Sequence, residues 1–323
     1  MPKITEILTS RRLASTVIRG AISILLIGFV VWNLDMSELA STLSTVSVTT
    51  FVVLVSIDLF LRFLSAYRWN VLFAALQNST SMIVIIKISF IASFLGQVLP
   101  GTIGVEALRV YGLAQSSNNG PAAFASVVAD RVFGLLSLVF VIYIGLLIGP
   151  QKLQAMILMP ATVALAILIL FLFLLMYPLP RQWIFAAIPA RFLEKLQHRI
   201  ADVFSCLDSY KTKPGVLLYS FVLSILFQLL RVLLFYAAAL LIGEAPSFVY
   251  FLALVPIVMF AALLPISIGG LGVREASLVV LFSHFNLMDG TQTFTVAILV
   301  FVSGIISILP GGWFYMGQRK QLT

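Results

Sequence analysis

Two stretches of this chain carry the same pattern of helix-breaking and anion-binding residues. The first runs from Leu99 to Arg109 and the second from Leu264 to Arg274, and both fit L-P-x-[ST]-I-G-x4-R. Because proline ends or kinks a helix and glycine permits a sharp turn, each copy predicts a helix that breaks and starts again. The predicted helix-break residues are Pro100, Gly101, Gly104, Pro265, Gly269 and Gly270.

The chemistry expected at these breaks is the binding of a phosphate. A helix that restarts presents unpaired N–H groups and the positive end of its dipole, and both favour an anion. The hydroxyl groups of Thr102 and Ser267 can bond the backbone groups that the break sets free. About one and a half turns further along the helix, Arg109 and Arg274 can add bidentate contacts to a phosphate. The pattern therefore predicts a lipid phosphate bound between the two elements.

The same arginines have an alternative role that involves no ligand. Each copy has an acidic residue close by, Glu106 in the first and Glu275 in the second. An ion pair between each arginine and its own acidic neighbour would hold the hairpin together. One side chain can serve both purposes, so the two interpretations stay open.

Three further charged residues fall inside apolar stretches, where an ionisable group is costly and usually faces the interior of a helix bundle. Asp130 and Arg131 are adjacent, so on a helix they point about 100° apart and cannot pair well with each other. Each is expected to meet a partner on another helix, and Asp130 could pair with Arg109. Arg231 follows Gln228 by three residues and has no acidic residue near it in sequence, which favours a polar cavity or an anionic ligand.

The other reactive residues predict structure rather than chemistry. Asp58 and Arg62 lie four residues apart, so they share a helix face and can neutralise one another. His198 and His284 are isolated, and Cys206 is the only cysteine. The chain therefore has no cysteine cluster and no spacing typical of a metal site, and no cofactor is expected.

The composition is that of a membrane protein. Of the 323 residues, 61% are hydrophobic and 10% are charged, whereas a soluble domain carries about 25% charge. The apolar runs are long enough for transmembrane helices, which satisfy their own backbone in lipid. The net charge of +8 comes largely from basic residues between the apolar runs, as the positive-inside rule produces. Nucleic acid is therefore not an expected partner.

Eight apolar segments are expected to enter the membrane. They cover residues 17–34, 49–73, 80–99, 121–148, 155–177, 214–242, 246–284 and 291–316. Basic residues place the N-terminus, the C-terminus and the connector 178–213 on the cytoplasmic side, and Arg68 marks the return of the second segment to that side. The connector is basic and amphipathic, suited to the headgroup region, although a solvated loop that contains a helix fits equally well.

These assignments give two regions an even number of crossings. Region 80–120 must begin and end inside, and region 246–290 must begin and end outside. Each is therefore a re-entrant hairpin or a pair of crossings, and the two enter from opposite sides, as in an inverted repeat. We predict an all-α fold in one transmembrane domain, residues 1–323, with six full spans, two re-entrant or broken hairpins, and the connector 178–213 between its halves.

The two repeated stretches also resemble a known family. Phe94-Leu-Gly-Gln-Val-Leu-Pro-Gly-Thr-Ile-Gly-Val-Glu-Ala-Leu-Arg109, the later Ala129-Asp130-Arg131 and the second copy up to Glu275 are similar to the lysylphosphatidylglycerol synthase transmembrane region, the flippase-like UPF0104 family. In bifunctional members this module moves an aminoacylated phospholipid between leaflets, and a separate soluble domain makes that lipid. This sequence ends soon after its last apolar segment, so the synthase activity is not expected here.

The resemblance implies a transporter of a polar or anionic lipid, of the phospholipid, glycolipid or polyprenyl-phosphate type, in the cell membrane. No P-loop for ATP is present, so any driving force would be a gradient or a partner. The residues expected to contact the headgroup are Arg109, Arg274, Arg231, Glu106, Asp130, Arg131, Glu275, Thr102 and Ser267. The alternatives are a membrane enzyme with Asp130 or Glu106 as general base, and a non-catalytic partner of a lipid-modifying enzyme.

Overall fold

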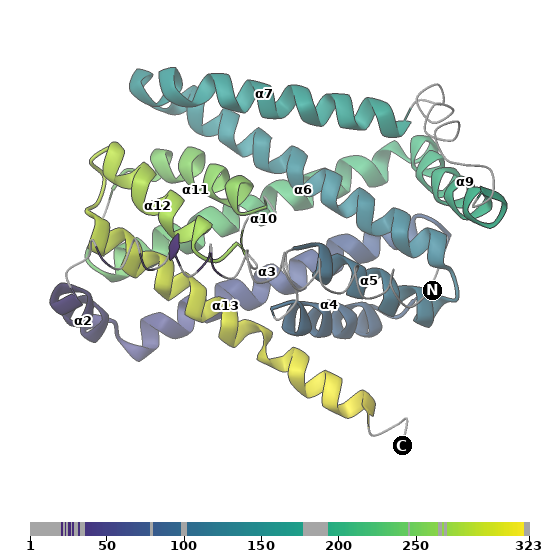
Figure 1. Ribbon diagram of the computed structural model, residues 1–323, viewed down its shortest axis with the longest axis horizontal. Coiled ribbons are helices and arrows are strands. Elements are labelled where there is room, and N and C mark those ends of the chain that lie inside the picture. Colours follow the sequence, from purple (N-terminus) through teal and green to yellow (C-terminus); the bar gives the residue numbers. More distant parts are fainter. Residues whose placement is uncertain are drawn as a thin grey trace. The chain divides into compact units, whose positions relative to one another are not determined.

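The computed structural model describes residues 36–77, 80–97, 102–176, 193–244, 246–263 and 270–319, with residues 21, 23, 25, 26, 28, 32 and 267. The regular elements in these ranges are all helical, so the predicted all-α class is confirmed for them (Figure 1). The helices are α2 (Met36–Thr45), α3 (Val48–Ala74), α4 (Met82–Gly96), α5 (Thr102–Ser117), α6 (Gly120–Ile148), α7 (Gln151–Met176), α9 (Leu193–Ser209), the 3-10 turn η2 (Tyr210–Thr212), α10 (Pro214–Leu241), α11 (Phe248–Leu263), α12 (Val273–His284) and α13 (Gly290–Arg319).

The helices differ in whether their length and composition would let them cross a bilayer. Within the described residues, four stretches are long and apolar enough to span a bilayer, in α6, α7, α10 and α13. By contrast, α4 and α5 have 15 and 16 residues, and α11 and α12 have 16 and 12, against about 20 needed for a span. These short pairs fall in the two regions where broken helices are predicted. The number of spans and the re-entrant entry of the hairpins stay predictions.

The chain forms two compact units. The first contains residues 1–59, 90–106 and 231–323, and the second contains residues 60–89 and 107–230. Helix α9, at the end of the predicted connector, therefore belongs to the second unit.

The second unit is built around large side chains of α3. Trp69 and Phe73 are fully buried against Ile88 of α4, Leu113 of α5 and alanines of α6. A Cβ on Gly112 would lie 2.9 Å from the Ile88 side chain, so glycine lets α5 approach α4 closely. The apolar runs thus place α3, α4, α5 and α6 around one core.

Polar contacts tie the segment after α9 to the end of α3. The Tyr210 hydroxyl donates to the carbonyl of Leu72 at 2.8 Å, and Lys213 donates to the carbonyl of Ala75. Burial raises the pKa of the Tyr210 phenol well above its usual value, so Tyr210 stays a neutral donor. Helix α9 also lies against α6, so it is a docked element of the second unit.

The first unit packs α11, α12 and α13 next to one another (Figure 1). Its core contains an edge-to-face pair, Phe251 of α11 and Phe282 of α12, with ring centres 4.9 Å apart. Helix α13 contacts the backbone of α4 at Gly311. A Cβ added to Gly311 would lie 2.2 Å from the carbonyl oxygen of Phe90, which is too close for a real side chain. Only glycine allows so close a contact.

Candidate functional site

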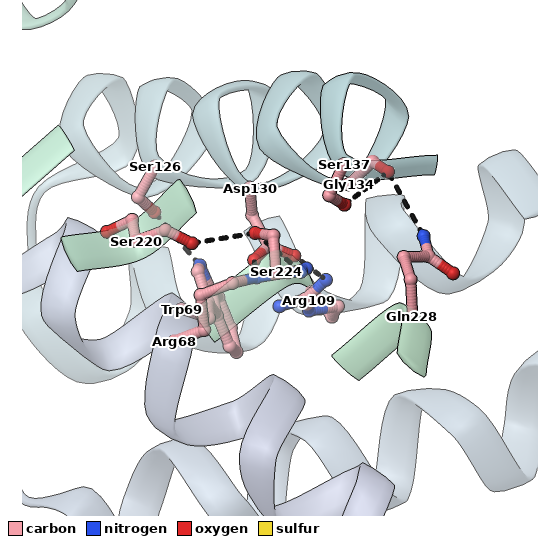
Figure 2. Close-up of polar contacts among 10 residues, drawn as sticks. All are labelled: Arg68, Trp69, Arg109, Ser126, Asp130, Gly134, Ser137, Ser220, Ser224 and Gln228. Carbon is pink, nitrogen blue, oxygen red and sulfur yellow. Dashed lines mark hydrogen bonds and ion pairs between the residues drawn. The ribbon is translucent and has the colours of Figure 1, made fainter. Parts of the chain in front are cut away.

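Asp130 of α6 is held by two arginines from two other helices. Its Oδ1 accepts from Nε of Arg68 on α3 at 2.7 Å, and its Oδ2 accepts from Nη1 of Arg109 on α5 at 3.0 Å. Figure 2 shows both guanidinium groups directed at the carboxylate. The three side chains, named here the Asp130 cluster, all belong to the second unit. The predicted pair of Asp130 with Arg109 is therefore present, and Arg68 joins it.

An aromatic ring supports the Arg109 side of the cluster. The guanidinium carbon of Arg109 lies 4.1 Å from the centre of the Trp69 ring, close enough for a cation–π interaction. The indole N–H of Trp69 donates to Oγ of Ser126 at 3.0 Å, which orients the ring. Trp69 thus links the core of the second unit to the charge of Arg109.

Helix α10 supports the Arg68 side. Nη1 of Arg68 donates to Oγ of Ser224 at 3.0 Å, and its guanidinium carbon lies 5.5 Å from the centre of the Phe227 ring. One turn further along α10, the side-chain amide of Gln228 donates to the carbonyl of Gly134 on α6 at 3.1 Å. Polar side chains of α10 therefore contact both α3 and α6 (Figure 2).

The Asp130 cluster is buried and carries unequal charge. Arg68, Arg109 and Asp130 expose 5%, 6% and 2% of their surface. Two guanidinium groups share one carboxylate, so these three side chains sum to one positive charge. Burying ions costs free energy that good geometry and added hydrogen bonds must offset.

The second motif copy uses its arginine differently. Arg274 donates from Nε and Nη2 to the same oxygen, Oε1 of Glu275, at 3.0 Å and 2.5 Å. The other oxygen of Glu275 accepts from the backbone N–H of Gly272 at 2.7 Å, at the start of α12. The alternative in which the arginine pairs with its own acidic neighbour is therefore the observed arrangement in this copy.

The helix restarts at different places in the two copies. In the first copy α5 begins at Thr102, so Gly104 lies inside its first turn rather than at the break. In the second copy α12 begins at Val273, so Arg274 lies in the first turn and not one and a half turns along. The reason is the backbone of Gly270 and Gly272, with φ of +80° and +81°, which a right-handed helix does not allow.

Comparison with known proteins identifies the family of this chain. Residues 16–312 match the family model of the lysylphosphatidylglycerol synthase TM region. The chain belongs to this family. It is also similar to a UPF0104 membrane protein of Pyrococcus horikoshii, with 25% identity over 286 residues that cover 80% of this chain and 84% of the relative. The resemblance seen in the sequence is confirmed, and it indicates a multi-pass membrane protein with a lipid-related role.

The remaining predicted site residues of this family member are spread over both units. Ser267 is 1% exposed, and its Oγ has no hydrogen-bond partner among the residues that the structure describes. Glu106 and Arg231 lie in the first unit and Arg131 in the second, and their contact with a headgroup stays a prediction. The placements of Pro100, Gly101, Pro265 and Gly269, and the side chain of Thr102, lie outside what the structure describes.

One residue of the Asp130 cluster, Arg68, was not predicted as a site residue from the sequence. Arg68 was expected to mark the cytoplasmic end of the second segment, but it is buried against Asp130. The positive-inside rule treats a basic residue near the end of a span as a surface charge. Its place six residues before the end of α3, directly beside Trp69, was the available signal for an interior partner.

Proposed function

We propose that this chain moves a lipid with an anionic headgroup between the two leaflets of a cell membrane, as a flippase-like transporter. The observation that carries the proposal is the Asp130 cluster, in which two buried guanidinium groups share one carboxylate. A guanidinium presents a planar fork of donors that fits a phosphate. The expected substrate is a phospholipid, a glycolipid or a polyprenyl-phosphate lipid.

Charge balance explains why an anion would be the preferred cargo. A positive charge in a membrane interior is costly unless a negative charge lies near it. A headgroup phosphate beside the cluster would supply that charge for as long as it is bound. A zwitterionic headgroup brings its own cation with it and gains less from the same position.

In this proposal the lipid leaves chemically unchanged. The competing interpretation is an enzyme with Asp130 as general base. Both oxygens of Asp130 accept from guanidinium groups, which stabilise the carboxylate and make it a poor proton acceptor. Mass spectrometry of the lipids after incubation with the purified protein tests this part: a modified headgroup would favour the enzyme.

The direct test is lipid movement in proteoliposomes. The full chain is reconstituted with fluorescent phosphatidylglycerol, which is anionic, or fluorescent phosphatidylcholine, which is zwitterionic, and movement is followed by quenching of the outer leaflet. We expect the wild type to move phosphatidylglycerol faster. Arg109→Gln removes one of the two guanidinium groups and leaves Arg68 paired with Asp130, so the protein should fold and lose the headgroup preference.

A matched control separates the cluster from net charge. Lys211→Gln also removes one positive charge. Lys211 forms an ion pair with Asp208, and the two side chains are 43% and 41% exposed, respectively. This variant should keep the wild-type preference. If Arg109→Gln keeps it too, the cluster does not select the headgroup and the proposal is wrong.

A further inference from the structure

A second aspartate of the membrane helices has an environment unlike that of Asp130. Asp58 is the eleventh residue of the 27-residue helix α3, so it lies well inside the helix, about 15 Å from its start. It belongs to the first unit, where α3 meets α13. An ionisable residue inside a membrane helix is expensive and commonly has a function.

The carboxylate of Asp58 faces a notch in α13. Its Oδ2 lies 3.2 Å from the position that a Cβ on Gly304 would occupy. It also lies 3.3 Å from Oγ of Ser307, which is fully buried one turn further along. The absence of a side chain at Gly304 therefore makes room for this carboxylate, and Ser307 gives it a polar neighbour.

A count of hydrogens shows what each protonation state of Asp58 requires in this notch. The Ser307 hydroxyl has one hydrogen, and its oxygen lies 2.8 Å from the carbonyl oxygen of Gly304 as well as 3.3 Å from Asp58. If the hydrogen goes to the shorter contact, an ionised Asp58 faces a hydroxyl lone pair. A protonated Asp58 donates to Ser307 while Ser307 donates to Gly304, so each of the two hydroxyl hydrogens has an acceptor.

We propose that Asp58 takes up and releases a proton inside the membrane, and that this step couples lipid movement to a proton gradient. The coupling rests on the proposed lipid transport, whereas the proton site rests on the notch alone. In the protonated state Asp58 is neutral, and its burial in lipid costs much less free energy than burial of the charged form. In the ionised state it requires water or a cation, so the two states favour different surroundings of α3 and α13.

A charged group close to Asp58 could keep its carboxylate ionised and so compete with a proton. On its own helix the nearest is Arg62, four residues later, which can hold the carboxylate ionised. Helix α13 carries no Asp, Glu, Lys, Arg or His from Gly290 to Gln318. The test therefore has to separate a carboxylate that binds a proton from one that Arg62 keeps charged.

Infrared difference spectroscopy of the full chain in lipid nanodiscs tests the proton site without any transport. Because the chain has 12 Asp and Glu residues, the Asp58 signal is the part of the protonated-carboxyl C=O stretch that the wild type gains on acidification and that Asp58→Asn lacks. Ser307→Ala should shift the band, because its hydrogen-bond acceptor is lost. The matched control is Ser303→Ala: Ser303 is as buried as Ser307, but its hydroxyl donates to the carbonyl of Val300 at 2.9 Å, so the band should not change.

The coupling is tested in proteoliposomes with fluorescent phosphatidylglycerol and an imposed pH gradient. One proton per lipid across one pH unit supports up to about tenfold lipid asymmetry between leaflets. We expect the wild type to build such an asymmetry and Asp58→Asn to equilibrate the lipid without it.

Each result decides one part of the proposal. If Asp58→Asn removes no part of the carboxyl signal that the wild type gains on acidification, the proton site is overturned and Arg62 is favoured as a permanent partner. Gradient-independent movement in the wild type overturns the coupling alone. A wild type that moves no fluorescent phosphatidylglycerol overturns the transport and the coupling, while the infrared titration still decides whether Asp58 binds the proton.

Discussion

The two copies of L-P-x-[ST]-I-G-x4-R have the same spacing and different structures. Arg109 lies two turns into α5 and reaches Asp130 on another helix, whereas Arg274 lies in the first turn of α12 and pairs with the next residue, Glu275. One arginine joins helices of a buried core, and the other reinforces the start of its own helix. Equal spacing in a sequence therefore does not imply equal roles for the arginines.

The residues inside the unspecified part of the pattern account for the difference. Gly270 and Gly272 of the second copy adopt positive φ and delay the helix. The corresponding residues of the first copy are Val105 and Ala107, which disfavour that backbone and continue the helix. The pattern that defines the repeat thus omits the positions that decide where each arginine points.

The largest effect is expected from Asp130→Asn. This change leaves Arg68 and Arg109 buried without a carboxylate, and removing one partner of a buried ion pair costs about 3–5 kcal/mol. Thermal unfolding of the purified protein in detergent should show a large loss of stability. Asp130→Glu keeps the charge and is the control, for which we expect a much smaller loss. Equal losses would mean that side-chain length, and not charge, holds the cluster.

A smaller effect is expected where the second copy delays its helix. In Gly272→Ala the alanine must keep φ near +81° and ψ near −45°, a sparsely populated backbone conformation that costs about 1–3 kcal/mol. Gly215→Ala is the matched control, since Gly215 lies in α10 with open space around its Cβ position and alanine favours a helix. If Gly272→Ala is as stable as this control, backbone strain does not set the start of α12.

Several features of this comparison could be read from the sequence. The long apolar runs predicted the helices, and the two low-charge regions with Pro and Gly predicted breaks where α4–α5 and α11–α12 now lie. The cost of an isolated charge in lipid predicted that Asp130 would find Arg109. These results depend on local composition or on a strong energetic demand.

Other features depended on contacts between distant segments. Arg68 lies 62 residues before Asp130 in the chain, and its position near the end of a span made a surface role the simpler prediction. Helix α2 was not predicted, because it is short and lies outside the apolar runs. The delayed start of α12 was visible in Gly270 and Gly272, but glycine permits positive φ without requiring it. Packing decides such choices.

A smaller effect again is expected from the aromatic support of Arg109. Trp69→Phe keeps a ring but removes the N–H that donates to Ser126 and weakens the cation–π contact, at a cost of about 1 kcal/mol. A double-mutant cycle with Arg109→Gln isolates the contact from general packing. The same cycle for Phe301 and Arg274, 5.5 Å apart, should give a smaller coupling. Equal couplings would remove this difference between the copies.

The smallest effect is expected from Glu275→Gln. The amide oxygen can still accept from the backbone N–H of Gly272, so the start of α12 keeps its hydrogen bond. Only the ion pair with Arg274 is lost, and with the arginine side chain 22% exposed its contribution should be about 0.5 kcal/mol and should fall with added salt. A loss as large as that of Asp130→Asn would show that the second copy also anchors a buried core, and the difference between the roles of Arg109 and Arg274 would then be wrong.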